Sequence, residues 1–299
     1  MLIAELAALG AAFCWALSGL IIINPLRKIG ALALNRARMF FVFLMLAAVS
    51  VMTGAWRDFP VSTIQTLMIS GLIGIFLGDT ALFGSLKRLG PSRAAVVFAL
   101  HAPMTVIMGW FLLGEHLEVF TLIGCGIVTT GVIIAILGRR NHEEPQNIDS
   151  THGRLRYGIL LGLLGAFGQS AGAIIARPVM AEGVDPITAT AIRVGIAALC
   201  LIFTGFIPNP LFRSKTTFTI KLLVLIIVSG FLAMGVGMTL FMYGLSIGDA
   251  GVVATLSATT PVLILPLLWI NTGIRPPLMA WISAVVTVLG IALITIAWN

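Results

Sequence analysis

The amino-acid sequence predicts an all-α integral membrane protein with ten transmembrane helices, arranged as two inverted five-helix repeats. Three observations predict this fold class: an apolar composition, ten long apolar segments and a similarity between the two halves of the chain. Of the 299 residues, 59% are hydrophobic and 10% are charged, and the mean hydropathy is +1.09. Soluble domains carry about 25% charged residues, so this chain has too few charges to cover a water-soluble particle. The apolar content also excludes a disordered chain.

The apolar segments have the length that a membrane requires, because a helix that crosses the hydrocarbon core needs roughly 20 mostly apolar residues. Ten segments qualify: 2–23, 34–54, 62–84, 92–113, 118–138, 157–177, 187–207, 220–243, 250–271 and 277–298. Several are separated by short polar joints, so nine spans is the alternative count. The first segment lacks a basic n-region and contains Glu5, so we expect an uncleaved helix rather than a signal peptide.

A polar stretch near the middle divides the chain into two halves of similar size. We expect a first five-helix repeat over residues 1–140, an exposed polar linker over 141–156 and a second five-helix repeat over 157–299. The halves match at these paired positions: 17–25 with 170–178, Arg38 with Arg193, Gly71 and Gly78 with Gly230 and Gly237, and 89–103 with 247–261. Because five spans is an odd number, the second half must be inverted relative to the first. Inverted repeats with a site near the midplane are typical of secondary transporters.

The positive charges are distributed unevenly along the chain. All but three of the 18 Lys and Arg residues lie in the loops after the first, third, fifth, seventh and ninth segments, the exceptions being Arg57, Arg177 and Arg193. The positive-inside rule then places these loops in the cytoplasm and both termini outside it. The net charge of +7 is therefore attributed to loops that meet an anionic membrane face, and not to nucleic-acid binding.

The junction between the fourth and fifth segments carries a more specific pattern: Pro103, then Gly114 and Glu115, then Gly124 and Gly131. With ten spans in two halves, this pattern resembles the EamA branch of the drug/metabolite transporter superfamily over nearly the whole chain. The second half departs from it, with NTGIRPP at 271–277 where the glutamate would fall. The resemblance implies an exporter of amino acids or other small metabolites in the inner membrane, working by alternating access. Members of this branch are commonly drawn with cytoplasmic termini, which conflicts with the charge distribution; we follow the charges.

Ionisable side chains inside spans are costly and few, so each is a candidate for function. Asp79 lies late in the third segment, and His101 lies two residues before Pro103 in the fourth. On neighbouring helices they could bind a cationic group or relay a proton, because histidine titrates near neutral pH. In the structural alternative, Asp79 lies near the interface, where it is solvated or paired with Lys87 or Arg88, and His101 is hydrogen-bonded to a carbonyl group. Protons are thus a candidate coupling ion, and exchange without an ion fits the sequence equally well.

Other polar and aromatic residues complete the candidate substrate site. Trp15 and Ser18 in the first segment and Gln169 and Ser170 in the sixth are expected at corresponding depths. Thr260, beside Thr259, occupies in the ninth segment the place that 100–103 hold in the fourth. The alternatives are a packing role for Trp15 and bonds from each threonine to its own helix. Pro103 and Pro261 are expected to bend their helices and to assist gating.

Three further charges are assigned structural roles. Arg38 and Arg193 are paired by the repeat and could recognise a carboxylate or phosphate, but we favour ties between helix ends and headgroups or neighbours. Glu115 is expected to act in packing and gating at the opposite interface.

Several classes of protein are excluded by absent motifs. The sequence has no Walker A motif, no HExxH or GxSxG motif, no metal-ligand cluster, and no channel filter. The cysteines Cys14, Cys125 and Cys200 suggest neither disulfides nor zinc. We therefore expect no enzyme, cofactor or metal. The alternatives to a metabolite transporter are a lipid or lipid-linked-substrate translocase and, from another class, an intramembrane enzyme. GxxxG spacings permit a monomer or a homodimer.

Overall fold

The computed structural model describes residues 2–89, 91–143, 152–206, 219–273 and 275–297. Within these ranges every regular element is helical. The first half contains α1 (Leu2–Ile29), α2 (Ala31–Thr53), η1 (Ala55–Asp58), α3 (Val61–Gly71), η2 (Leu72–Leu77), α4 (Gly78–Leu89), α5 (Pro91–Ala99), α6 (His101–Met108), η3 (Gly109–Leu113) and α7 (Val119–Glu143). The second half contains α8 (His152–Ala181), α9 (Pro186–Thr204), α10 (Ile220–Gly230), η4 (Phe231–Gly237), α11 (Met238–Ile247), α12 (Ala250–Ser257), α13 (Thr260–Thr272) and α14 (Leu278–Ala297).

The described helices agree with a protein that crosses a membrane many times. Nine described segments, four of them made of two or three consecutive helical elements, are long and apolar enough to span a bilayer, and a further apolar segment, Leu278–Ile294, is shorter. The expected linker is partly helical, because α7 continues to Glu143 and α8 begins at His152. The middle of that linker, residues 144–151, lies outside the described residues.

Two of the expected spans are interrupted, and both interruptions precede a proline. The fourth span is divided at Leu100 between α5 and α6, and the ninth is divided at Ala258–Thr259 between α12 and α13. Pro103 follows the first interruption and Pro261 the second. A proline lacks the N–H that would bond to the preceding turn, and its ring crowds that turn, so a helix tends to break before it.

Two other spans contain a short π-helical segment in their middle. These segments, η2 and η4, begin immediately after Gly71 and Gly230, two glycines that the repeat pairs. A π-helical turn inserts one extra residue and shifts the hydrogen bonds to i→i+5, and such turns occur frequently at functional sites. The helix faces before and after each segment are therefore rotated relative to each other.

The same two glycines allow close contact between the halves of the chain. A Cβ atom at Gly71 would lie 2.5 Å from the carbonyl oxygen of Arg193 in α9, and a Cβ atom at Gly230 would lie 2.6 Å from Cγ of Arg38 in α2. Both contacts leave no space for a methyl group. Each half thus packs a glycine against the arginine-bearing helix of the other half.

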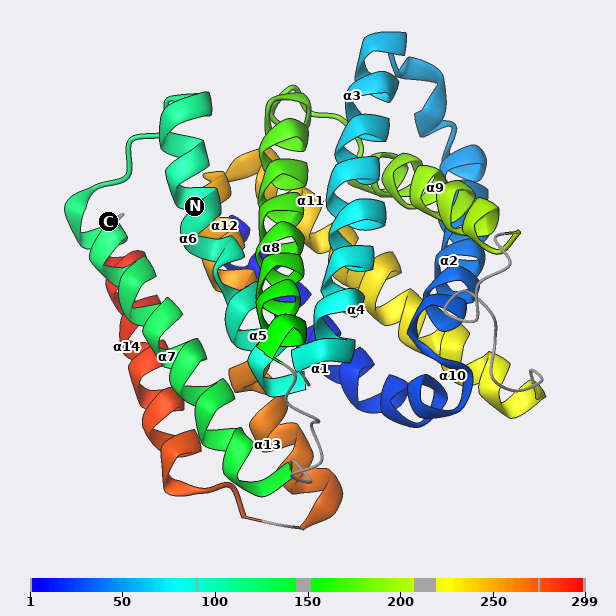
Figure 1. Ribbon diagram of the computed structural model, residues 1–299. Helices are drawn as coiled ribbons and strands as arrows, with labels where there is room; N and C mark the ends of the chain where they lie inside the picture. The colour runs from blue at the N-terminus through cyan, green and yellow to red at the C-terminus, as the bar shows by residue number, and fades with distance from the viewer. Residues whose placement is uncertain (1, 90, 144–151, 207–218, 274, 298–299) are drawn as a thin grey trace.

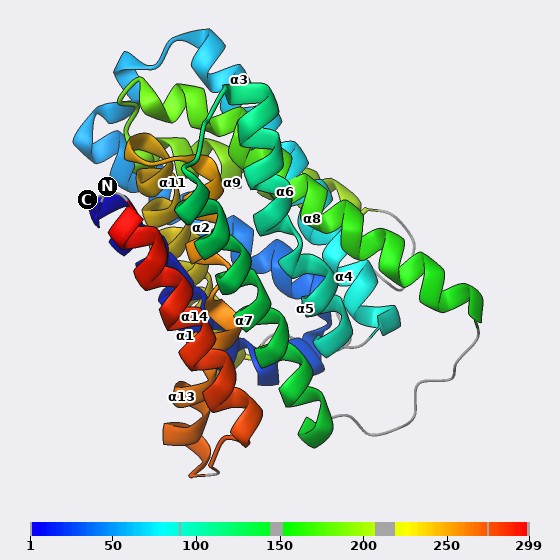
Figure 2. The same cartoon turned by 90° about the vertical axis from the view of Figure 1, so that its left-hand side faces the viewer.

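The ends of the helices alternate between two sides of the molecule. Figure 1 shows the α1–α2 turn, the end of α4 with the beginning of α5, and the end of α13 with the beginning of α14 at the lower end. The turns α2–α3, α8–α9 and α11–α12 lie toward the upper end. The beginning of α1 lies in the upper part of both views, and so does the end of α14 (Figures 1 and 2). Helices α7 and α14 run side by side in both views, and α8 contacts α3, α4, α5 and α6.

Candidate functional site

The break between α5 and α6 brings polar groups into the protein interior. His101 begins α6, is buried, and stacks against Phe98 with ring centroids 5.1 Å apart. Its carbonyl oxygen accepts hydrogen bonds from Thr105 Oγ1 at 2.7 Å and from Ser170 Oγ of α8 at 2.8 Å. The hydroxyl groups thus supply donors at a carbonyl next to the interruption. Ser170 thus connects α8 to this break by a hydrogen bond. The side chain of the neighbouring Gln169 is partly buried.

The break between α12 and α13 has a similar contact with α1. Thr260 Oγ1 lies 3.3 Å from the carbonyl oxygen of Ala12 and 3.1 Å from that of Ser257. Thr259 Oγ1 donates to the carbonyl oxygen of Leu256 at 2.7 Å. Both threonines therefore bond back to the last turn of α12, within the same span, and Thr260 also reaches α1. The first helix of each half, α1 or α8, thus meets the broken helix of the other.

Trp15 and Ser18 connect α1 to the span that contains η4. Trp15 Nε1 donates to the carbonyl oxygen of Ala233 at 2.8 Å, and its ring lies 5.9 Å from that of Phe241. Ser18 Oγ donates to the carbonyl oxygen of Ser229 at 2.8 Å. The indole N–H is therefore engaged within the protein in the described conformation.

Asp79 lies beside α2, at the start of α4. It interacts electrostatically with Arg38 and, through a side-chain contact, with Asn35. Arg38 Nη2 in turn donates to Asn35 Oδ1 at 3.1 Å. Asn35 therefore links the two charges. This arrangement differs from the expected partners Lys87 and Arg88, since Arg88 Nη1 donates to the carbonyl oxygen of Gly84, and the Lys87 side chain lies outside the described residues.

Arg193 is in a different environment from Arg38. Its side chain is fully buried, and Nη1 contacts the sulfur atoms of Met238 at 3.5 Å and Met242 at 3.0 Å. Within the described ranges, Nε and Nη2 have no hydrogen-bond partner. A guanidinium group in the interior is thus left with weak acceptors only.

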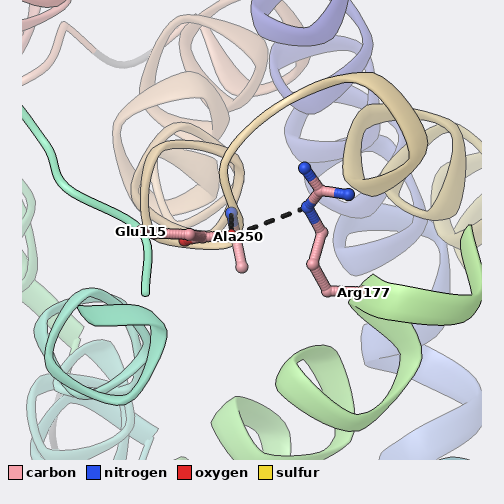
Figure 3. A network of polar contacts seen from close by, with 3 residues as sticks. All are labelled: Glu115, Arg177 and Ala250. Carbon is pink, nitrogen blue, oxygen red and sulfur yellow. Dashed lines mark hydrogen bonds and ion pairs between the residues drawn. The ribbon is translucent and has the colours of Figure 1, made fainter. Parts of the chain in front are cut away.

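A third charged group joins three elements at the upper end of the molecule. Gly114 ends η3 with φ 67°, a left-handed conformation that favours glycine. Glu115 follows, and its Oε1 accepts a hydrogen bond from the N–H of Ala250, the first residue of α12, at 3.0 Å. The same oxygen lies 3.6 Å from Arg177 Nε of α8. Figure 3 shows Glu115 beside the beginning of α12, with the Arg177 side chain reaching toward it. Glu115 therefore connects the turn before α7 to α8 and α12.

The electrostatics of this network set its pH dependence. Burial raises the pKa of the Glu115 carboxyl, while the Ala250 N–H and Arg177 act in the opposite direction. Burial likewise raises the pKa of Asp249, which Arg177 opposes. Both carboxyl groups hold a proton more tightly in the folded protein than in the unfolded chain. The free energy of unfolding should therefore fall as the pH rises from the ordinary pKa values of these carboxyl groups in the unfolded chain to their raised pKa values in the folded protein.

This predicts a specific effect of Glu115→Gln. In the variant, the thermal unfolding midpoint should fall less steeply as the pH rises above 4.5, the ordinary pKa of a glutamate. One of the two carboxyl groups with a raised pKa is then absent. The decline should not vanish, since Asp249 remains. Thermal unfolding of the purified protein from acidic to neutral pH would measure it. Glu118→Gln, at an exposed position in the same turn, should keep the wild-type slope; a slope equally flat in both variants would contradict the prediction.

The structure groups some of the sequence-predicted residues and separates others. His101 and Ser170 lie together, as do Asp79 and Arg38, but no contact joins Asp79 to His101 among the described residues. Asn35 was not predicted as a partner of Asp79. That Asn35 lies three residues before Arg38, one helical turn away, could have indicated it. The Arg177–Glu115 pair had no local signal, because 62 residues separate the two positions.

Comparisons with known proteins agree with this architecture. The EamA-like transporter family matches residues 2–137 and 156–296. An uncharacterized transporter of Archaeoglobus fulgidus is 26% identical over 262 residues, covering 86% of this chain and 85% of the relative. A WAT1-related protein of Arabidopsis thaliana is 28% identical over 108 residues, covering 32% of this chain and 29% of the relative. A crystal structure of another protein superposes with a TM-score of 0.81 at 19% identity, covering 98% of this chain and 96% of that one, and so shows a shared fold.

The many apolar helices, together with these relatives, define the class as a multi-pass α-helical membrane transporter. Within that class, the chain belongs to the EamA-like transporter family, which matches most of its length.

Proposed function

We propose that this protein is a secondary transporter that exports small metabolites such as amino acids by alternating access. In this proposal, residues 1–140 and 157–299 form two inverted repeats of five spans each, so that α14 supplies the tenth span. The repeats rock around a substrate site near the midplane. The transporter acts as a monomer or a homodimer in the inner membrane.

The observation that carries the proposal is the pair of helix breaks with their reciprocal contacts. Ser170 of α8 bonds to the carbonyl of His101 at the first break, and Thr260 at the second break reaches the carbonyl of Ala12 in α1. Irregular backbone inside a membrane is tolerated where it is buried in protein or lines a water-filled cavity. Discontinuous helices near the midplane form the substrate sites of many secondary transporters.

The candidate residues take roles in this scheme. Trp15, Asp79, His101, Gln169 and Thr260 would contact substrate when one side opens. Pro103 and Pro261 maintain the breaks, and the Arg38–Asp79 interaction stabilises the first half. The contacts of Glu115 with Ala250 and Arg177 would close the end that carries the termini. The charge distribution places that end outside the cytoplasm.

Counterflow in proteoliposomes tests the proposal. Wild-type protein should accelerate the exchange of at least one member of a pool of labelled amino acids and related metabolites, and the exchange should saturate. His101→Ala should lose most of this flux, because it alters the buried side chain next to the first break, whereas His116→Ala, at an exposed loop position, should not. A parallel series with and without a pH gradient decides whether protons are coupled.

The outcomes separate the alternatives. Flux that does not change with the pH gradient would support the transporter hypothesis but contradict coupling to protons. No flux for any soluble compound, together with accelerated movement of a labelled lipid between leaflets, would contradict the proposal and favour a lipid translocase.

A further inference from the structure

Arg193 is a buried cation for which the described chain supplies no counterion. Its side chain is 0% exposed, inside a membrane-spanning helix. Two methionine sulfur atoms contact Nη1, and Nε and Nη2 have no partner among the described residues. Thioether sulfur is a weak acceptor. Burying an unpaired charge is costly, and such a group calls for a partner that comes from elsewhere.

The paired arginine of the first half shows what is missing. Arg38 is the eighth residue of α2, and Arg193 is the eighth residue of α9. Arg38 Nη2 donates to Asn35 Oδ1, and Asp79 attracts the guanidinium group electrostatically, while Arg38 Nε, like Arg193 Nε, has no hydrogen-bond partner among the described residues. Each arginine-bearing helix also contacts a glycine-containing span of its own half, α2 at α4 and α9 at α11. Gly78 is followed there by Asp79, and its counterpart Gly237 is followed by Met238.

Both partners are therefore replaced in the second half. Met238 stands where the carboxylate of Asp79 stands in the first half, and it contacts Arg193 directly. Thr190, three residues before Arg193, occupies the place of Asn35. Its hydroxyl donates to the carbonyl oxygen of Pro186 at 2.7 Å and is thus directed along its own helix. The second half retains the cation but lacks the anion and the amide that balance it in the first.

The free side of the guanidinium group faces a glycine in a π-helical segment. A Cβ atom placed on Gly74 of η2 would lie 3.2 Å from Arg193 Nη2. Any larger residue at this position would cover the nitrogen atom that has no partner. The same Cβ atom would lie 3.1 Å from Cα of Gly172 in α8, so glycine at position 74 permits the close packing of η2 on α8 and also leaves no side chain between η2 and Nη2.

We propose that Arg193 binds the carboxylate of the transported solute. This inference rests on the proposed transport function and deepens it, because it restricts the substrates to carboxylate-bearing metabolites. A guanidinium group suits this task, since it presents parallel N–H donors that match a carboxylate. In the described conformation the group is occluded, and it gains access to the solute when the second half moves relative to η2 and α11.

Met238→Asp provides a direct test, because it places an internal carboxylate where the first half has one. We expect thermal stabilisation of the purified full-length protein by at least one L-amino acid or small organic acid, and none by the matching carboxamide. Arg193→Met and Met238→Asp should abolish this difference, and Met238→Leu, the matched control, should keep it. In counterflow, Arg193→Met should weaken half-saturation for the acid by about 30-fold or more, as expected when one member of a buried charge pair is removed.

The result that overturns the inference is equal stabilisation by acid and amide, or retained acid selectivity in correctly folded Arg193→Met or Met238→Asp. Stabilisation by phosphatidylglycerol but by no soluble acid would also overturn it. Failure of the transport proposal is distinguishable, because the wild-type protein would then move no solute at all. If Met238→Asp does not fold, Arg193→Met alone tests the proposal, because the methionine side chain at position 193 introduces no buried charge.

Discussion

Replacing Gly131 by alanine is expected to separate α14 from α7 and to lower the stability of the protein substantially. A Cβ atom at this position would lie 2.9 Å from the backbone nitrogen of Thr287 and 3.1 Å from the carbonyl oxygen of Ser283, both in α14. Backbone atoms cannot rotate away, so the helices would have to move apart. Overpacking of this kind costs about 1–3 kcal/mol, which corresponds to a thermal midpoint about 5 °C lower.

The same helix offers a matched control. Gly126 also lies in α7, but a Cβ atom there meets nothing within 4 Å. Both substitutions raise helix propensity in the same way, so only the contact with α14 differs. The thermal midpoint of Gly126→Ala should equal that of the wild type or lie slightly above it. Equal midpoints for Gly131→Ala and Gly126→Ala would show that α14 is not held against α7 by this close approach.

The packing of α7 on α14 also illustrates what the sequence could predict. The apolar runs predicted the spans, and the small residues predicted close approach between helices. These features could not predict which helix packs against the glycines of α7, because any apolar helix can pack closely against a helix face lined with glycine. Gly124 lies two turns before Gly131, and a Cβ atom there would lie 3.0 Å from the carbonyl oxygen of Gly290. Only the three-dimensional structure shows that both glycines face the last helix.

The interruptions of the helices were partly predictable, for a local reason. Pro103 and Pro261 predicted bends, and the breaks lie at Leu100 and at Ala258–Thr259. The π-helical segments η2 and η4 had no comparable signal, because one extra residue in a turn leaves an apolar run equally apolar. The glycines before them, Gly71 and Gly230, were matched by the repeat, but a matched glycine does not specify a hydrogen-bond register.

The partners of the charged residues were the least predictable feature. The sequence suggested Lys87 or Arg88 for Asp79 because they are near in the chain. A helix rises about 1.5 Å per residue, so eight or nine residues carry those side chains two turns away from Asp79. Arg38 is 41 positions distant in the sequence but interacts with Asp79 because α2 lies near α4. Such pairs depend on tertiary packing, which no local pattern contains.

Removing the carboxylate of Asp79 is expected to have the other large effect. Asp79→Met would leave Arg38 with Asn35 as its remaining described partner, in a membrane-spanning segment. Breaking one side of a fully buried charge pair costs about 3–5 kcal/mol, and because the Arg38 and Asp79 side chains are partly buried, the loss here should be smaller but of the same sign. We expect lower folded yield and a lower thermal midpoint. The double variant Arg38→Met/Asp79→Met should recover most of the loss, because no unpaired charge remains.

The double-mutant cycle distinguishes a charge pair from two independent residues. If the pair is coupled, the combined loss should be smaller than the sum of the single losses by about 0.5–3 kcal/mol. Thermal unfolding of the four proteins measures it. Additive losses would show that Asp79 does not balance Arg38, and the contrast with Arg193 and Met238 would then lose its basis. A coupled pair would mean that the first half carries its own counterion, whereas the second half lacks one at the corresponding position.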